Sequence, residues 1–169
     1  MIDFGFPDSK KIVGEITWAT VFNPHHWGFR GSAIRVQGQY WNVTTGRLIS
    51  GIVDTEATRW TMPSSFVDFY YSFVPGAAYE RNLKVWFFLC TVKLPDIVIT
   101  IEGKDITVPG SNINAGSIGS GICSGDLEAV ENEDEMAIFG PPFMKHLYII
   151  FGAAEGYMPK LGFAQSHWP

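Results

Sequence analysis

Charged residues are scarce in this chain, and basic residues are the scarcer kind. Only 17% of the 169 residues are charged, and 12 Lys and Arg stand against 17 Asp and Glu, which gives a formal net charge of −5. No run of Lys or Arg occurs in the sequence. Proteins that hold nucleic acids or anionic membrane surfaces neutralise phosphate groups with clusters of such cations. The composition therefore predicts neither a nucleic-acid partner nor a membrane surface.

Long hydrophobic runs are missing as well. No stretch reaches the roughly 18 uninterrupted apolar residues that a membrane-spanning helix needs. A secretory signal has a basic segment ahead of an apolar stretch, and the first residues, MIDFGFPD, show neither. From the sequence as given, we expect a cytoplasmic protein.

Metal-ligating residues are few and badly spaced. The two cysteines, Cys90 and Cys123, have no histidine at the spacing of a zinc site. The acidic run 126–135 lacks the alternating spacing and the turn glycine of a calcium loop. We therefore expect no metal and no cofactor. The two cysteines can form a single disulfide or remain as buried free thiols, which is the usual state in a cytosolic chain.

Aromatic residues, glycine and proline are plentiful instead. Aromatics make up 15% of the chain, beside 18 Gly and 10 Pro, and 46% of all residues are hydrophobic. This balance is typical of a packed core rather than of a disordered chain. It predicts one domain, residues 1–169, built of short strands that tight turns connect.

The apolar periodicity places the expected elements. Strands are predicted over 14–21, 27–36, 40–43, 48–54, 86–89, 97–101, 104–108, 147–151 and 161–164. A helix is expected after Pro63, with Ser64 as its N-cap, and a second short helix over 143–146. The Gly/Ser-rich segment 116–125 is expected to be a loop.

An ordered series of segments resembles the C-terminal lobe of pepsin-like aspartic proteases, especially the fungal ones. The segments are Gly5-Phe6 through Thr17, Trp27 with Phe29, Asp54-Thr55-Glu56, Pro63 through Tyr71, Leu94-Pro95-Asp96-Ile97, Ile138-Phe139-Gly140 and Leu161-Gly162-Phe163-Ala164. The resemblance implies a mainly β fold, namely a single pepsin-like lobe of antiparallel sheets in a partly open barrel with two or three short helices. It also implies that Cys90 and Cys123 form the disulfide of that lobe.

The chain departs from this family at its central motif. Pepsin-like enzymes have two lobes, each with an Asp-Thr-Gly motif, and their two carboxylates share one proton to activate a water. Only one such motif occurs here, and Glu56 replaces its glycine, which in the family lets the backbone pack closely. We therefore expect no endopeptidase activity from this chain.

Asp54 and Glu56 are the predicted catalytic pair. Two neighbouring carboxylates raise the pKa of one of them and can then act as acid and base. Alternatively, the motif is a decayed active site, with Glu56 in solvent or paired with Arg59. The predicted substrate-binding residues are Thr55, Thr58, Trp60, Met62, Trp86 and Phe139. The last four are expected to line a pocket near Asp54, where the missing lobe would lie, or alternatively to cover an apolar surface that this lobe leaves bare or to form a dimer contact.

Three functions fit these residues. The favoured one is a non-proteolytic enzyme that cyclises or isomerises an apolar, secondary-metabolite-like small molecule by acid–base chemistry. The second is a pseudoprotease lobe that binds a peptide, a ligand or a protein partner. The third is a homodimeric half protease with Asp54 from each copy, which the extra charge of Glu56 disfavours. The expected partners are an apolar small molecule and a second copy or partner protein on the face of the missing lobe.

Overall fold

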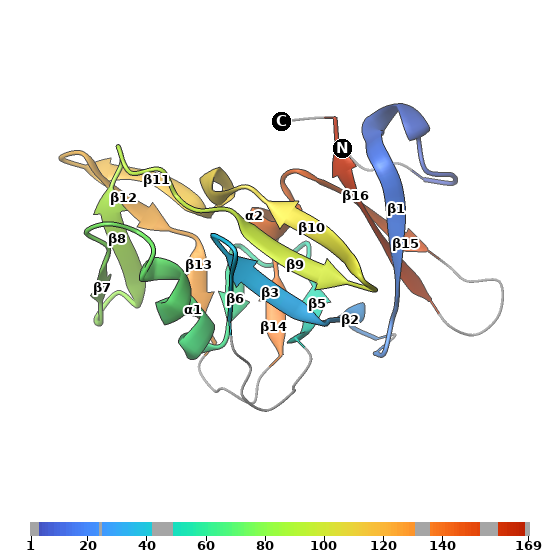
Figure 1. Cartoon of the computed structure of the whole chain (residues 1–169), viewed down its shortest axis with the longest axis horizontal. Coiled ribbons are helices and arrows are strands. Elements are labelled where there is room, and N and C mark those ends of the chain that lie inside the picture. Colours follow the sequence, from blue (N-terminus) through green and yellow to red (C-terminus); the bar gives the residue numbers. More distant parts are fainter. Residues whose placement is uncertain (1–3, 24, 42–48, 131–135, 153–158, 168–169) are drawn as a thin grey trace.

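A computed structural model describes residues 4–23, 25–41, 49–130, 136–152 and 159–167 (Figure 1). The strands are β1 (Ile12–Thr20), β2 (Gly28–Gly31), β3 (Ala33–Val36), β4 (Gln39–Tyr40), β5 (Ile49–Val53), β6 (Trp60–Met62), β7 (Ala78–Glu80), β8 (Val85–Leu89), β9 (Ile97–Ile101), β10 (Lys104–Val108), β11 (Asn114–Gly119), β12 (Ile122–Gly125), β13 (Leu127–Ala129), β14 (Ala137–Phe139), β15 (Leu147–Gly152) and β16 (Lys160–Ser166). The helices are α1 (Ser64–Tyr71) and α2 (Pro141–Met144), and 3-10 turns occupy Ser9–Lys11 and Gly110–Ile113. The predicted mainly β lobe with short helices is confirmed. Within the described ranges, no helix is long and apolar enough to cross a membrane.

The strands form four sheets, none of which closes into a barrel within the described residues. Their orders are β1-β16-β15, β10-β9-β3-β4, β11-β12-β8-β7 and β13-β6-β14-β5-β2. Figure 1 shows the first sheet at one end of the molecule and the β11-β12-β8-β7 sheet at the other. Most neighbouring strands are antiparallel, and the parallel pairs β13–β6 and β14–β5 belong to the five-stranded sheet.

The five-stranded sheet contains a threaded arrangement. β14 lies between β5 and β6, parallel to β5 and antiparallel to β6, so that Ile138 faces Ile52 on one side and Thr61 on the other. The Thr61 hydroxyl oxygen accepts a hydrogen bond from the Ile138 N–H at 3.2 Å. The loop 54–59 connects β5 to β6. It therefore begins and ends on the two strands that flank β14.

Aromatic side chains from three strands of this sheet form a cluster with Phe143 of α2. Phe139 is wholly buried, and its ring centroid lies 4.8 Å from that of Phe29, 5.5 Å from that of Trp60 and 4.7 Å from that of Phe143. Such tilted and edge-on ring pairs add to the stabilisation that burial provides. Gly51 leaves room for the cluster, because a Cβ at this position would collide with the Phe139 ring.

The disulfide that the family resemblance implies is present. Cys90 and Cys123 are bonded, with their Cα atoms 5.0 Å apart. Cys90 follows the end of β8, and Cys123 lies on β12, which pairs with β8. The bridge therefore reinforces two neighbouring strands of the sheet β11-β12-β8-β7, and the alternative of two free thiols is wrong.

Two predicted elements differ from the structure. The segment 116–125 is not a loop but most of the hairpin β11–β12, whose glycines Gly116, Gly119 and Gly121 have positive φ angles. Glycine tolerates this conformation, so a glycine-rich sequence here still forms paired strands. The predicted strand 27–36 is divided into β2 and β3, because the chain passes at Ser32 from one sheet to another.

The helix boundaries also shift. Pro63, not Ser64, occupies the N-cap position of α1, and the Pro63 carbonyl accepts hydrogen bonds from the amides of Phe66 and Val67. The second helix begins two residues earlier than predicted, because Pro141 and Pro142 suit the first helical turn, where a missing N–H leaves no bond unmade. Three predicted segments fall partly outside the described residues, at residues 42 and 43 of the predicted strand 40–43, residue 48 of the predicted strand 48–54 and residues 131–135 of the acidic run.

Candidate functional site

Asp54 begins the loop that joins β5 to β6. Its N–H donates a hydrogen bond to the Phe139 carbonyl at 3.3 Å, which ties the loop to β14. Its Oδ1 accepts hydrogen bonds from the main-chain N–H groups of Glu56 at 2.8 Å and Ala57 at 3.3 Å. An aspartate that binds the amides two and three residues ahead folds the chain into a tight turn. The turn therefore fixes the orientation of the Asp54 carboxylate.

The predicted polar site residues lie on the exposed side of this turn. Asp54 is half-buried, whereas Thr55, Glu56 and Thr58 are exposed. Glu56 is absent from the described residues with positive φ, so the turn accepts a side chain here without left-handed strain. Two carboxylates thus share one short loop that faces solvent.

Gly140 supports the far end of the loop. A Cβ at Gly140 would collide with the Arg59 carbonyl oxygen and would lie 3.2 Å from the Ala57 Cβ. The Ile138-Phe139-Gly140 segment therefore needs glycine at its third position for close packing against the loop.

Arg59 lies at the centre of a charged cluster with Asp126 and Glu128, the Arg59 cluster, which the sequence did not predict. Its guanidinium Nη1 lies 2.9 Å from Glu128 Oε1 and 3.6 Å from Asp126 Oδ1, and donates a hydrogen bond to the Gly125 carbonyl at 3.1 Å. The sequence left open an ion pair between Arg59 and Glu56. In the structure, the carboxylates that pair with Arg59 are instead Glu128 on β13 and Asp126 just before it. Partial burial raises the pKa of both Asp126 and Glu128, and the nearby guanidinium opposes this rise.

Comparison of the sequence with known proteins identifies a family. Residues 1–166 match the family described as eukaryotic aspartyl protease. The chain belongs to that family. It is 38% identical to penicillopepsin-1 of Penicillium janthinellum, over 96% of this chain and 48% of that protein. It is 34% identical to aspergillopepsin-1 of Aspergillus oryzae, over 96% of this chain and 40% of that protein.

The match covers only part of each of these relatives. The chain spans less than half the length of the curated relatives that it matches. The predicted resemblance to fungal pepsin-like proteases is confirmed.

Three of the predicted substrate-binding residues of this aspartyl protease lobe lie in its core. Trp60, Met62 and Phe139 have no exposed surface, so their placement on a bare apolar face is wrong. The cause is the alternation of side chains along β6 and β14, which turns these residues inward. Trp86 is half-buried on β8, where its ring stacks on Tyr71 with centroids 4.5 Å apart.

A partly open hollow of about 420 Å³ lies elsewhere on the lobe. Its lining residues are Thr20, Phe22, Arg30, Gly31, Ser32, Glu102 and Gly103. None of the predicted site residues is among them. Across the residues described, no group of three or more His, Cys, Asp or Glu side chains is placed to hold a metal ion.

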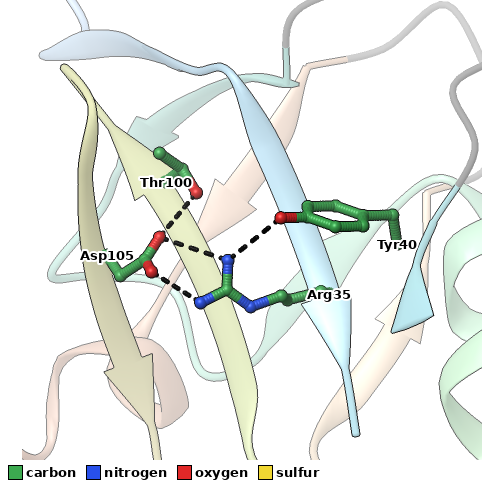
Figure 2. Close-up of polar contacts among 4 residues, drawn as sticks. All are labelled: Arg35, Tyr40, Thr100 and Asp105. Carbon is green, nitrogen blue, oxygen red and sulfur yellow. Dashed lines mark hydrogen bonds and ion pairs between the residues drawn. The ribbon is translucent and has the colours of Figure 1, made fainter. Parts of the chain in front are cut away.

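A second Arg–carboxylate pair lies on the sheet β10-β9-β3-β4 (Figure 2). Arg35 Nη2 lies 2.5 Å from Asp105 Oδ2, the Thr100 hydroxyl donates to Asp105 Oδ1 at 2.7 Å, and Arg35 reaches the Tyr40 hydroxyl at 3.5 Å. The hydrogen bond from Arg35, and to a smaller extent the one from Thr100, lower the pKa of Asp105 below its ordinary value. This pair lies on other strands than the Arg59 cluster and provides a matched control for it.

The Arg35 pair predicts a pH effect with a defined sign. A carboxyl whose pKa is lowered by folding stabilises the fold above its unfolded pKa, and loses this contribution as the pH falls through its folded pKa. We expect Arg35→Gln to raise the pKa of Asp105 toward its ordinary value in a carboxyl ¹³C NMR titration. An unchanged Asp105 midpoint would show that Thr100 alone sets it.

Proposed function

We propose that this lobe presents Asp54 as the acid–base carboxylate of a two-part site, which a second protein surface completes. The single observation behind the proposal is the turn at Asp54, in which two main-chain N–H groups hold Oδ1. A carboxylate held in one orientation is prepared for proton transfer, because its geometry need not be assembled during the reaction.

The lobe alone is not expected to hydrolyse peptide bonds. The chemistry of this family rests on two carboxylates that share a proton. In the part of the chain that the structure describes, Glu56 is the only other acidic side chain on the 54–59 loop. It follows Asp54 by two residues on the same exposed turn, so it does not face Asp54 from an opposing surface as a second lobe would.

Glu56 supports a second candidate function. An ionisable and exposed side chain, in place of a small neutral one, can act as the partner acid or base for a small apolar substrate, as in a cyclisation or isomerisation. That reaction needs a cover over the loop to exclude water. Both candidates therefore require a second surface, and they differ in whether Glu56 takes part.

Reconstitution tests the proposal. The purified chain is mixed with the part of penicillopepsin-1 that lies outside the matched region, and cleavage of a denatured protein substrate is followed from acidic to neutral pH. The chain alone should show no cleavage. A Glu56→Gly variant in the mixture should show cleavage, and Asp54→Asn in that variant should lower the rate by about a hundredfold or more. Asp68→Asn, the same change at an exposed position on α1, is the control.

Two outcomes would contradict the proposal. Cleavage by the chain alone, with a rate that rises with the square of its concentration, would favour the homodimeric half protease. Association of the two parts without any Asp54-dependent turnover would favour the pseudoprotease lobe. In the second candidate function, Glu56→Gln as well as Asp54→Asn abolishes turnover of a small substrate.

A further inference from the structure

The Arg59 cluster joins the Asp54 loop to the neighbouring strand by several contacts. Arg59 is the last residue of the loop, directly before β6. The next residue, Trp60, donates its N–H to the Asp126 carbonyl at 3.1 Å. The Arg59 guanidinium binds Glu128 and the Gly125 carbonyl. The end of the loop is therefore held through both main chain and side chain, with Gly140 packed against its carbonyl.

The charges in this cluster do not balance. The single guanidinium of Arg59 forms ion pairs with two carboxylates. Only 18% of the Asp126 side chain and 26% of the Glu128 side chain are exposed to solvent. Among the residues that the structure describes, the other charged or titratable groups that act on them are Lys145, Lys84 and Tyr71, which add weaker interactions. The Tyr71 hydroxyl is already bound to the Leu127 carbonyl at 3.3 Å.

This imbalance has a defined effect on stability. A carboxyl whose pKa is raised by folding makes the fold more stable as the pH falls through the range between its folded and unfolded pKa values. The ionised forms of Asp126 and Glu128 therefore oppose folding at neutral pH, even with Arg59 beside them. Their presence calls for an explanation other than stability, and half-buried ion pairs can fix a geometry at the expense of stability.

We infer that Arg59 is a positioning residue for Asp54: its ion pair with Glu128 holds the 54–59 loop against β13, and protonation of Glu128 releases the loop. The inference deepens the proposed function and rests on it for any effect on turnover. It assigns Arg59, Glu128 and Asp126 no contact with a substrate. The position of Asp54 then depends on pH through Glu128, which lies outside the Asp54 turn.

The first test needs no activity. At pH 7 the hydrogen exchange of the Glu56 and Ala57 amides, which bind Asp54 Oδ1, is compared between the wild type and Glu128→Gln. The neutral glutamine mimics protonated Glu128, so exchange of these two amides should accelerate by about tenfold, the factor that corresponds to the loss of one charged hydrogen bond. Arg59→Gln should have the same effect, and Arg59→Lys a smaller one, because lysine keeps the charge without the planar fork.

Stability measurements separate positioning from a purely structural role. Glu128→Gln should leave the free energy of unfolding in urea unchanged or raised, because it removes a carboxylate whose ionisation opposes folding. Arg35→Gln, which breaks the pair of Figure 2, should leave exchange at Glu56 and Ala57 unchanged. Unchanged exchange in Glu128→Gln, or acceleration spread evenly over the whole lobe with a loss of stability, would overturn the inference.

The second test uses the reconstituted site. In the Glu56→Gly background, the ratio of turnover with native Glu128 to turnover with Glu128→Gln should be largest near neutral pH. It should approach one as the pH falls, because native Glu128 then becomes protonated. A constant ratio would overturn the pH dependence. If the amides respond but no Asp54-dependent turnover is found, the proposed function fails, whereas the role of Arg59 in holding the loop stands.

Discussion

Phe139→Ala should lower the free energy of unfolding by about 3–5 kcal/mol, the range for removal of a buried aromatic ring. The ring has no exposed surface and contacts Phe29, Trp60 and Phe143. Neighbours on three sides cannot all move into the vacated space, so a cavity remains. Urea unfolding followed by circular dichroism measures the effect.

Phe6→Ala is the matched control for this substitution. Phe6 is 94% exposed, so the same truncation should change stability by no more than about 0.5 kcal/mol. If the two variants differed by less than about 1 kcal/mol, the aromatic cluster would not be the centre of the core. Phe139 is also the residue whose carbonyl binds the Asp54 N–H, so exchange at the Asp54 amide should accelerate in Phe139→Ala alone.

The double substitution Cys90→Ser and Cys123→Ser should cost about 3–4 kcal/mol of stability. The bridge closes a segment with a sequence separation of 33 residues, and the chain-entropy relation for a loop of that length gives this range. Unfolding in urea of the oxidised wild type, the reduced wild type and the double variant measures it. The reduced wild type and the variant should agree, and a reduced protein as stable as the oxidised one would contradict the prediction.

Local patterns were enough to predict most strands. The hairpin β9–β10 follows from two alternating apolar segments around Glu102-Gly103, and both turn residues adopt the positive φ that a tight hairpin needs. The β11–β12 hairpin was missed because its glycines suggested a loop. Their conformational freedom supports bulged strands equally well, and pairing with β8 decides between the two.

The candidate site was predicted less completely than the fold. Asp54 and Glu56 were located by the motif, but the orientation of Trp60 and Met62 depends on which face of β6 is covered, and this is a property of the assembled sheet. Arg59 binds the Gly125 carbonyl, 66 residues away in sequence. No local sequence pattern indicates a partner at that distance.

The threaded strand β14 has a consequence for how fast the lobe folds. Ile138 must reach Thr61 across 77 residues of sequence, and such distant pairings slow folding because the chain has to close a long loop first. The Cys90–Cys123 bridge lies wholly inside that segment and bypasses 33 of its residues. In an unfolded chain that keeps its disulfide, the loop that must close before β14 can pair with β6 is therefore shorter. Oxidised protein diluted from denaturant should regain its native signal sooner than reduced protein, so the bridge acts on the rate of assembly as well as on the finished fold.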